Sequence, residues 1–390
     1  MSTLLDEIAD VGRDGRRGGY SRHGFDRVEA ELRIWFAEQA RRRGLDVRTD
    51  RNGNLWAWWG RPGPGAVVTG SHLDSVPGGG AFDGPLGVVA ALDAVDVLRG
   101  KGFQPARPLA VVVFCEEEGG RFGVPCLGSR LMTGAIDPDV ARRLTDPDGV
   151  TLADAALVAG IDPVGFGADS VLDDVGCFVE LHVEQGRLLG AAPIGVASSI
   201  VAHGRWRFTV TGEGNHAGTT EVADRHDPML PAAAAVLAAR KAITGADARA
   251  TVGRLVPVPG GTNVIASSVN FWLDARGPDA RAVVADITAA VQGAAVEEGC
   301  RVAVREESYG AEVRFDSALR DQVAGILGGV PLIPTGAGHD AGILAGRVPT
   351  AMLFVRNPTG VSHAPAEFAE AADCAAGVRA LAAVLESLCR

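Results

Sequence analysis

Histidine and acidic residues recur at five places that end or follow a stretch typical of a strand. They are His72 with Asp74, Asp83, the run Glu116–Glu118, His182 and His363. Imidazole and carboxylate groups together suit zinc, manganese or cobalt, whereas oxygen ligands alone would indicate magnesium or calcium. These residues are therefore candidates for a metal site.

Each of these places has an ordinary alternative, because a lone buried histidine is usually a core residue and adjacent glutamates are usually solvated. The run Glu116–Glu118, however, stands at the carboxyl end of the apolar stretch LAVVVF. Ionised carboxylates next to a core are costly unless they are paired or bind a metal. Asp74 stands two residues after His72, where it can accept the second N–H of a metal-bound imidazole. These placements favour ligation.

Strand-like and helix-like segments alternate around these residues. We expect helices at Glu29–Arg43, 86–99 and Ala371–Leu388, and strands at Asn54–Trp59, Ala66–Gly70, Leu109–Phe114, Cys177–Glu184 and Thr350–Val355. The unbroken apolar run Leu109–Phe114 is typical of a strand buried on both faces of a mostly parallel sheet. Sites in open α/β sheets gather at the carboxyl ends of strands, so the five places can converge.

The section from about Arg205 to Arg305 has a pattern of its own. Strands at Arg205–Thr211, Ala250–Pro257, Asn263–Arg276 and Arg301–Glu306 alternate with helices at Pro228–Ile243 and Ala280–Glu298. The order β-α-β-β-α-β is that of a ferredoxin-like unit. We therefore predict an α/β protein with a larger mixed-sheet catalytic domain (1–200 and 307–390) and a smaller inserted α+β domain (201–306), which suits a chain of 390 residues.

Composition excludes several classes of protein. With 37 Lys and Arg against 48 Asp and Glu, the net charge is −11, which argues against a nucleic-acid partner. No stretch approaches the roughly 20 apolar residues of a membrane span, and the first residues carry no apolar signal core. Six cysteines without a Cys-x-x-Cys pair are typical of reduced thiols. We expect a cytoplasmic protein with no membrane partner.

Eight motifs between about His72 and His363 resemble the M20 metallopeptidase clan and, within it, the amidase branch. That branch comprises N-carbamoyl-L-amino acid hydrolases, allantoate amidohydrolases and β-ureidopropionases. In chain order the motifs are GSHLDSVPGGGAFDGPLGV, EEEGGRFG, ELHVEQG, GNHAGTT, GGTNVI, LDAR, GAGHDA and GVSHAPAE. Each one alone is weak, but their order makes coincidence implausible. His182, where peptidase relatives have a carboxylate, indicates the amidase branch.

The resemblance implies a site with two divalent metal ions, zinc, manganese or cobalt. His72, Asp83 and His182 would bind one ion. Asp83, Glu118 and His363 would bind the other, so that Asp83 bridges the pair. Two such ions about 3.5–4 Å apart can lower the pKa of a water molecule toward neutral.

The resemblance also implies catalytic roles. Glu117 matches the general base, which takes a proton from the water and passes it to the departing nitrogen. Asp74 matches the residue that orients His72. The inserted domain resembles the family's lid and dimerisation domain, so a homodimer is implied. His216 would reach the partner's active site and stabilise the oxyanion there.

The same resemblance implies substrate contacts. Asn263 and Arg276 would hold a carboxylate, and Gln185 would lie near the ureido or amide group. Gly338 and His339 would lie in a loop that supplies further contacts. An arginine fork matches a carboxylate with two parallel hydrogen bonds. The alternative for Arg276 is a structural salt bridge at a strand end.

We therefore predict hydrolysis of the ureido C–N bond of a small substrate with a carboxylate, releasing ammonia and carbon dioxide. Allantoate is favoured because 354–363 resembles allantoate amidohydrolases, and an N-carbamoyl-L-amino acid is the alternative. His182 argues against a dipeptidase or aminoacylase of the clan. A non-catalytic binding relative is disfavoured because every ligand and the base are present. A serine hydrolase is disfavoured because no G-x-S-x-G elbow occurs.

Overall fold

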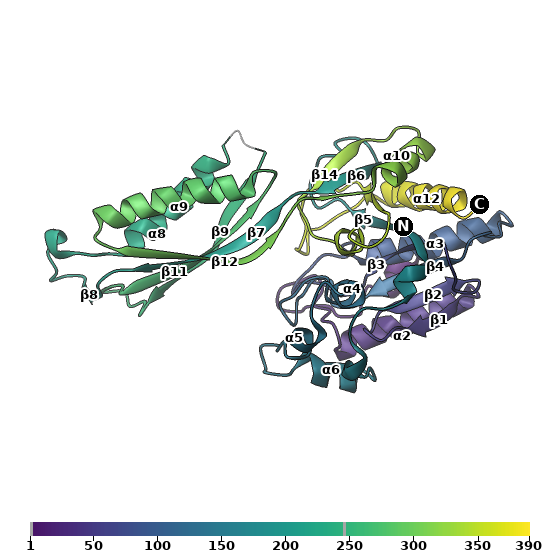
Figure 1. The fold of residues 1–390 in the computed structure, drawn as a ribbon, viewed down its shortest axis with the longest axis horizontal. Helices are drawn as coiled ribbons and strands as arrows, with labels where there is room; N and C mark the ends of the chain where they lie inside the picture. The colour runs from purple at the N-terminus through teal and green to yellow at the C-terminus, as the bar shows by residue number, and fades with distance from the viewer. Residues whose placement is uncertain (1–2, 245–246) are drawn as a thin grey trace. The chain divides into compact units, whose positions relative to one another are not determined.

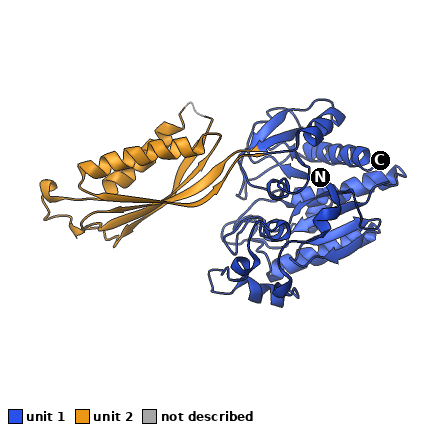
Figure 2. Ribbon diagram, viewed as in Figure 1, with its two compact units in different colours: residues 1–199, 314–390 blue, residues 200–313 orange. Residues whose placement is uncertain are grey.

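The computed structural model describes residues 3–244 and 247–390, which form two compact units (Figures 1 and 2). Unit 1 comprises Met1–Ser199 and Arg314–Arg390, and unit 2 comprises Ile200–Val313. The expected inserted domain ended at residue 306, whereas unit 2 continues because its last long strand, β12 (Arg301–Gly310), runs beyond that point. Residues 1–2 and 245–246 of the two expected domains lie outside the described residues.

Unit 1 is built on a mixed sheet in the order β1-β2-β4-β3-β5-β15-β6-β13, with β14 paired to β6. The strands are β1 (Asp46–Thr49), β2 (Leu55–Trp59), β3 (Ala66–His72), β4 (Leu109–Phe114), β5 (Val175–Val183), β6 (Ile194–Ile200), β13 (Val313–Arg314), β14 (Leu332–Thr335) and β15 (Thr350–Val355). The adjacent strands β4, β3, β5 and β15 are mutually parallel, and β2 and β6 join them antiparallel. The predicted mixed α/β sheet is confirmed.

Helices cover both faces of this sheet (Figure 1). They are α1 (Thr3–Glu7), α2 (Arg27–Arg42), α3 (Pro85–Gly100), α4 (Leu127–Thr133), α5 (Pro138–Arg142), α6 (Leu152–Val158), α7 (Val171–Asp174), α10 (Ser317–Ile326), α11 (Asp340–Leu344) and α12 (Ala371–Leu388). The main core joins α2, α3, α10 and α12 to one face, and a second buried cluster contains α4, α5 and α6. Every residue of β4 is buried, as its continuous apolar sequence predicts.

Unit 2 is a four-stranded antiparallel sheet in the order β12-β7-β11-β9 with helices α8 (Met229–Ala242) and α9 (Ala280–Glu297) packed on one face. Strands β7 (His203–Thr211), β9 (Arg249–Val258), β11 (Ser268–Arg276) and β12 give the predicted β-α-β-β-α-β order. The single strand expected over Asn263–Arg276 is wrong. It divides into β10 (Val264–Ile265), paired with β8 (Asn215–His216), and β11, paired with β7 and β9, because the chain changes partner strands between Ile265 and Ser268.

Two further features concern membrane-spanning helices and disulfide bonds. Across the described ranges, none of the helices has both the length and the apolar character required to cross a bilayer. All six cysteines are free thiols, which agrees with the absence of a disulfide framework in their spacing.

Candidate metal centre

Four adjacent parallel strands bring the predicted ligands to one edge of the sheet. His72 is the last residue of β3 and lies in register with Phe114, the last residue of β4. His182 is the penultimate residue of β5 and pairs with Phe354 of β15. Glu116–Glu118 follow β4 directly, and His363 lies in the loop after β15. Because the strands are parallel, their carboxyl ends meet at the same edge.

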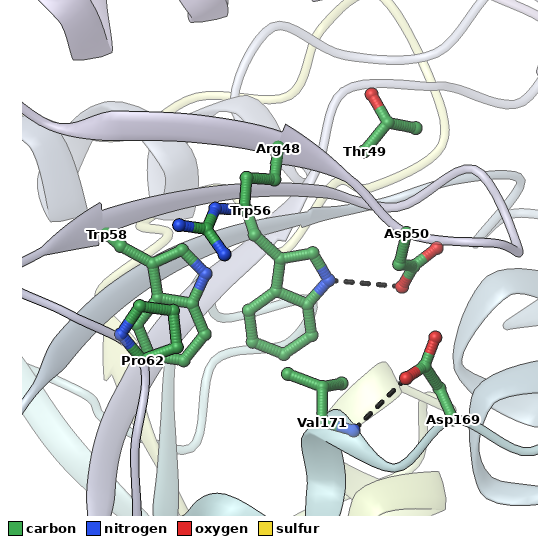
Figure 3. A pocket seen from close by; sticks show the side chains of 8 residues that line it. All are labelled: Arg48, Thr49, Asp50, Trp56, Trp58, Pro62, Asp169 and Val171. Carbon is green, nitrogen blue, oxygen red and sulfur yellow. Dashed lines mark hydrogen bonds between the residues drawn. The ribbon is translucent and has the colours of Figure 1, made fainter.

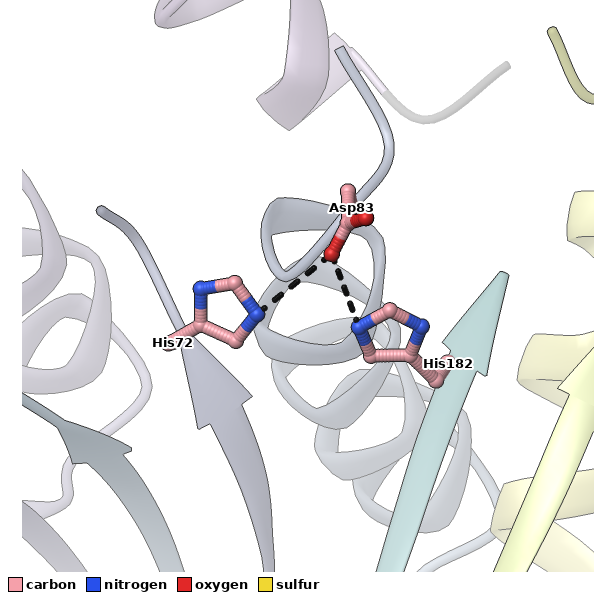
Figure 4. A group of neighbouring side chains, drawn as sticks. All are labelled: His72, Asp83 and His182. Atoms are coloured by element: carbon pink, nitrogen blue, oxygen red, sulfur yellow. Dashed lines mark ion pairs between the residues drawn. The ribbon is translucent and has the colours of Figure 1, made fainter. Parts of the chain in front are cut away.

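The first ligand group consists of two imidazoles facing one carboxylate oxygen (Figure 4). Nε2 of His72 lies 3.6 Å, and Nε2 of His182 lies 3.2 Å, from Oδ1 of Asp83. The Nδ1 atoms contact the carbonyl oxygens of Asp74 (3.0 Å) and Val183 (2.9 Å). A carbonyl only accepts hydrogen bonds, so each Nδ1 carries the proton and each Nε2 is left as a metal ligand.

The second group uses the other oxygen of the same carboxylate. Oδ2 of Asp83 lies 3.4 Å from Nε2 of His363, which also lies 3.4 Å from Oε2 of Glu118. Asp83 therefore presents one oxygen to each group, the arrangement expected of a bridging ligand. His363 adopts a left-handed backbone conformation (φ 55°), which is uncommon for a residue other than glycine.

The donor atoms of these groups fit metal ions. Within the described part of the chain, Nε2 of His72, Nε2 of His182 and Oε1 of Glu118 are buried without a hydrogen-bond partner. Buried polar atoms are rarely left in this state, and the two imidazole nitrogens face Oδ1 of Asp83. A cation in each group would give them a partner. Two imidazoles with carboxylates suit zinc, manganese or cobalt.

The electrostatics of the site point the same way. Burial raises the pKa of Glu117 well above its usual value, and burial together with Asp83 raises the pKa of Glu118 to about 7. Burial alone would also raise the pKa of Asp83, but the neighbouring imidazoles of His182, His363 and His72 hold it well below its usual range. The ionised forms of Glu117 and Glu118 are thus disfavoured by their surroundings. Divalent cations would stabilise these ionised forms.

Asp74 has a wider role than the one expected for it. Its carboxylate lies 3.5 Å from Nδ1 of His72, but the nearest acceptor for that nitrogen is the carbonyl oxygen of Asp74 itself. The carboxylate accepts the backbone N–H groups of Glu117 (3.1 Å) and Glu118 (3.0 Å). Asp74 therefore links the imidazole of β3 to the glutamate run after β4. Oε2 of Glu117 lies 3.6 Å from Nε2 of His72, beside the first ligand group.

Two of the predicted substrate contacts in unit 1 adjoin the cluster. Nε2 of Gln185 donates to Oδ2 of Asp83 (2.7 Å). His339 is buried with its ring centroid 4.5 Å from that of His182, whereas the neighbouring Gly338 is exposed. His339, His182 and Glu180 also have potential ligand atoms close together.

The carboxylate of that third group already has partners. Glu180 accepts hydrogen bonds from Ser71 Oγ (2.8 Å) and from the N–H of Ala341 (3.1 Å). It therefore serves the packing behind the metal centre rather than a further ion.

The other predicted contacts belong to unit 2, so their roles toward the metal centre stay predictions. His216 lies in β8 and pairs with Val264 of β10, and Asn263 precedes β10, where its carbonyl oxygen accepts the N–H of Ala217. Arg276 ends β11 and forms a two-pronged ion pair with Asp274, with N–O distances of 2.8 and 3.2 Å. The salt-bridge alternative for Arg276 is thus present in the structure.

Sequence reasoning missed a second layer of residues around Asp83. Oε2 of Glu367 accepts the N–H groups of Phe82 (2.8 Å) and Asp83 (3.0 Å), and Ser362 Oγ donates to Oδ2 of Asp83 (3.0 Å). Both residues lie in the motif GVSHAPAE beside His363, which was the available signal. In the glutamate run, Glu116 serves the backbone, because it accepts N–H groups of Gly24, Arg121 and Phe122.

A small cavity outside this cluster lies beside the stacked indoles of Trp56 and Trp58 (Figure 3). Its carboxylates have protein partners: Asp50 accepts from Nε1 of Trp56 (3.0 Å) and Asp169 from the N–H of Val171 (3.1 Å). The indoles are buried, which fits packing residues better than a stacking platform.

Comparison with known proteins agrees with this geometry. Residues 68–387 match the family described as Peptidase family M20/M25/M40. The chain is 37% identical to an N-carbamoyl-L-amino acid amidohydrolase of Geobacillus stearothermophilus, over 97% of this chain and 95% of that protein. It is 35% identical to an allantoate amidohydrolase of Bacillus subtilis, over 88% and 87%. A crystal structure of a hydantoinase/carbamoylase family amidase from Burkholderia ambifaria superposes with a TM-score of 0.85 at 32% identity, covering 100% of this chain and 96% of that one.

Proposed function

The chain belongs to the M20/M25/M40 peptidase family, in its amidase branch, and on this premise we propose that it is a di-metal amidohydrolase acting on a small ureido substrate with a carboxylate. One observation carries the proposal. The two oxygens of Asp83 face two separate ligand groups, and Glu117 lies beside the first of them. This combination suits hydrolysis at a carbonyl carbon bound to nitrogen.

The metal ligands are assigned from the two groups. His72, Asp83 and His182 would hold one ion, and Asp83, Glu118 and His363 the other. When bound, zinc, manganese or cobalt ions would lower the pKa of a water molecule and polarise the scissile carbonyl.

Glu117 is the proton carrier of this mechanism. Its side chain is buried, and Oε2 points toward the first ligand group. The Asp74 carboxylate fixes its backbone through the N–H of Glu117. Glu117 would take the proton of the attacking water and deliver it to the departing nitrogen. A ureido substrate would then give an amine and carbamate, which decays to ammonia and carbon dioxide.

His216 is the proposed donor to the oxyanion. Its Nδ1 accepts the N–H of Gly218 at 3.0 Å, so the neutral ring carries its proton on Nε2. The side chain is exposed on unit 2. An N–H held in this tautomer is suited to stabilise negative charge that develops on the carbonyl oxygen. In a homodimer, we assign it to the partner's active site.

Substrate recognition is assigned to the remaining residues. Arg276 and Asn263 would hold the carboxylate, and Gln185, which contacts Asp83, would lie near the ureido group. Gly338 and His339 would supply further contacts. Allantoate is the first candidate because of the loop at 354–363. An N-carbamoyl-L-amino acid is the second, and the 37% identical relative from Geobacillus supports it.

The surface of unit 2 supports the homodimer. Helix α8 exposes a run of apolar side chains: Met229, Leu230, Val236 and Leu237, of which Leu237 is 73% exposed. Apolar surface concentrated on one helix face is typical of an interface. The double variant Leu230→Glu/Leu237→Glu should sediment as a monomer where the unaltered protein sediments as a dimer. A monomeric unaltered protein would contradict this assignment.

A cytoplasmic location is also proposed, because six unpaired cysteines are typical of a reducing compartment.

Substrate assays test the proposal directly. The protein, loaded in turn with zinc, manganese and cobalt, is incubated with allantoate and with a set of N-carbamoyl-L-amino acids, and released ammonia is measured. Ammonia release that chelation abolishes supports the proposal, and the faster class identifies the substrate. Cleavage of dipeptides alone would contradict it.

A further inference from the structure

A buried thiol contacts the proposed general base, and the mechanism above gives it no task. Sγ of Cys126 lies 3.3 Å from Oε1 of Glu117, and the two residues are only 3% and 5% exposed. The other carboxylate oxygen, Oε2, lies 3.6 Å from Nε2 of His72 on the side of the metal ligands. The two oxygens of Glu117 are therefore distinguished by their neighbours.

The backbone fixes the spacing between this thiol and the carboxylate. Three consecutive N–H groups at the start of α4 donate to the segment that carries the glutamates. Cys126 N–H donates to the carbonyl oxygen of Glu117 (2.6 Å), Leu127 N–H to Glu116 (3.1 Å) and Gly128 N–H to Cys115 (3.0 Å). The start of the helix is thereby held against the residues that follow β4. The backbones of Cys126 and Glu117 are thereby held together, with the thiol within reach of the carboxylate.

The backbone conformation of Cys126 is itself unusual. Its φ is +56°, in the left-handed region, where glycine is the residue that fits without strain. Such strain concentrates at functional sites, where the surrounding structure holds it in place. A glycine here would relieve the strain but remove the thiol. The cysteine at this position indicates a use for its side chain.

The thiol is a hydrogen-bond donor in this setting. Burial, followed by the proximity of Glu117, raises the pKa of Cys126 well above its ordinary value, so the sulfur keeps its proton. A protonated thiol beside a carboxylate oxygen donates to it weakly. Glu117 Oε1 is the acceptor that the structure provides.

We propose that Cys126 is a positioning residue for Glu117, whose S–H donates to Oε1 and keeps Oε2 directed toward the metal ligands. The inference rests on the proposed function for the task of Glu117, but the contact itself does not. A base held in one orientation transfers its proton more effectively than one free to rotate.

Two substitutions isolate the hydrogen bond from the strain. Cys126→Ala and Cys126→Ser both retain a Cβ in the left-handed conformation, and only Cys126→Ser retains a donor. We expect Cys126→Ala to lower kcat about 10-fold, with KM changed by less than about twofold and both metal ions retained. Cys126→Ser should restore most of kcat. Cys177→Ala is the matched control, since Cys177 is a buried thiol in β5 with no contact to Glu117, and its kcat should not change.

Equal kcat values for the alanine and serine variants would overturn the proposal. So would loss of metal from Cys126→Ala in step with activity, because the thiol would then support the ligands rather than the base. Glu117→Gln, assayed beside them, separates the two levels of inference. Full activity in Glu117→Gln contradicts the proposed function, whereas an inactive Glu117→Gln with an unaffected Cys126→Ala contradicts only the role of Cys126.

A spectroscopic measurement tests the contact without activity. The S–H stretching region is recorded for the unaltered protein and for Glu117→Ala, and the difference between the two spectra reports the band of Cys126, the thiol that contacts Glu117. In Glu117→Ala, the same band should move to higher frequency because its acceptor is gone. An unshifted band would show that the thiol does not donate to Glu117, even if a Cys126 variant fails to fold.

Discussion

Oδ1 of Asp83 lies 3.2 Å from Nε2 of His182. The Nδ1 proton of that imidazole is held by the carbonyl oxygen of Val183. When the imidazole is neutral and the carboxylate is ionised, Nε2 and Oδ1 are therefore both acceptors. A proton or a cation must lie between them. Protons and metal ions therefore compete for this site, and its stability depends on which of them is bound.

The metal-free protein should lose stability as pH rises. A hydrogen bond to Asp83 raises the pKa of His363 to about 9, so its stabilising contribution is complete below 6.5 and disappears as pH rises through 9. Burial raises the pKa of Glu118 from its ordinary value of 4.5 to about 7. Because this carboxyl group ionises more easily in the unfolded chain, the folded state loses stability as pH rises from 4.5 to 7. Both effects lower the unfolding temperature of chelated protein from pH 5 to pH 9. Thermal scans should show this fall, and metal-loaded protein should show a smaller one. A chelated protein that becomes more stable across this range would contradict the assignment.

Glu117→Gln should separate catalysis from metal binding. The amide cannot accept the proton of water, so we expect kcat to fall by about 10²–10⁴-fold while both ions remain bound. Metal analysis and a rate assay on the same sample check this outcome. Glu118→Gln is the matched neighbour and should lose metal as well as activity. Loss of metal from Glu117→Gln, but not from Glu118→Gln, would mean that the two roles are exchanged.

Gly84→Ala should disrupt the first ligand group although residue 84 binds nothing itself. Gly84 has a φ of +86°, and a Cβ added there would overlap the imidazole ring of His72. His72 or the adjacent Asp83 must then move. We expect metal content and activity to fall together while the protein stays folded. Gly100→Ala in the same helix region is the control, because a Cβ there meets nothing. Normal metal content in Gly84→Ala would show that the ligand group is less tightly packed than described.

Arg276→Ala should weaken substrate use. If Arg276 holds the substrate carboxylate, kcat/KM should fall by an amount equivalent to about 2–4 kcal/mol. Arg205→Ala is the matched control, because Arg205 also lies near Asp274 (3.7 Å) but is 61% exposed. A normal kcat/KM for Arg276→Ala would contradict its role in substrate binding and favour a structural role such as the ion pair with Asp274.

The sequence predicted elements best where one physical cause determines the pattern. The apolar run Leu109–Phe114 became β4 with the same ends, since burial on both faces leaves no position for a polar side chain. The alternation in Cys177–Glu184 predicted a strand correctly, but its polar face is not solvated. Glu180, His182 and Glu184 are all buried. His182 faces Asp83, whereas Glu180 and Glu184 accept hydrogen bonds from other parts of the protein rather than from water.

Residue types marked the places that hold the five proposed ligands and the family resemblance chose among the residues there, but neither predicted the contacts that hold them. Glu367 binds the backbone of Asp83 across a separation of 284 residues, and no local pattern reports such a contact. The arrangement of the glutamate run depends likewise on Asp74, which accepts the N–H groups of Glu117 and Glu118 from the loop after β3. The interruption between β10 and β11 was not predicted because it depends on a change of partner strand, from β8 to β7 and β9, which residue types do not report.

Metal content measured on purified protein tests the central claim most directly. The account requires two ions per chain joined by Asp83, so protein produced with zinc, manganese and cobalt should contain two equivalents, and chelation should remove them together with activity. Asp83→Ala should retain neither ion in full, because it removes a ligand from both groups. A folded, unaltered protein that contains no ion and is indifferent to chelators, or an Asp83→Ala variant that still binds two, would contradict the account.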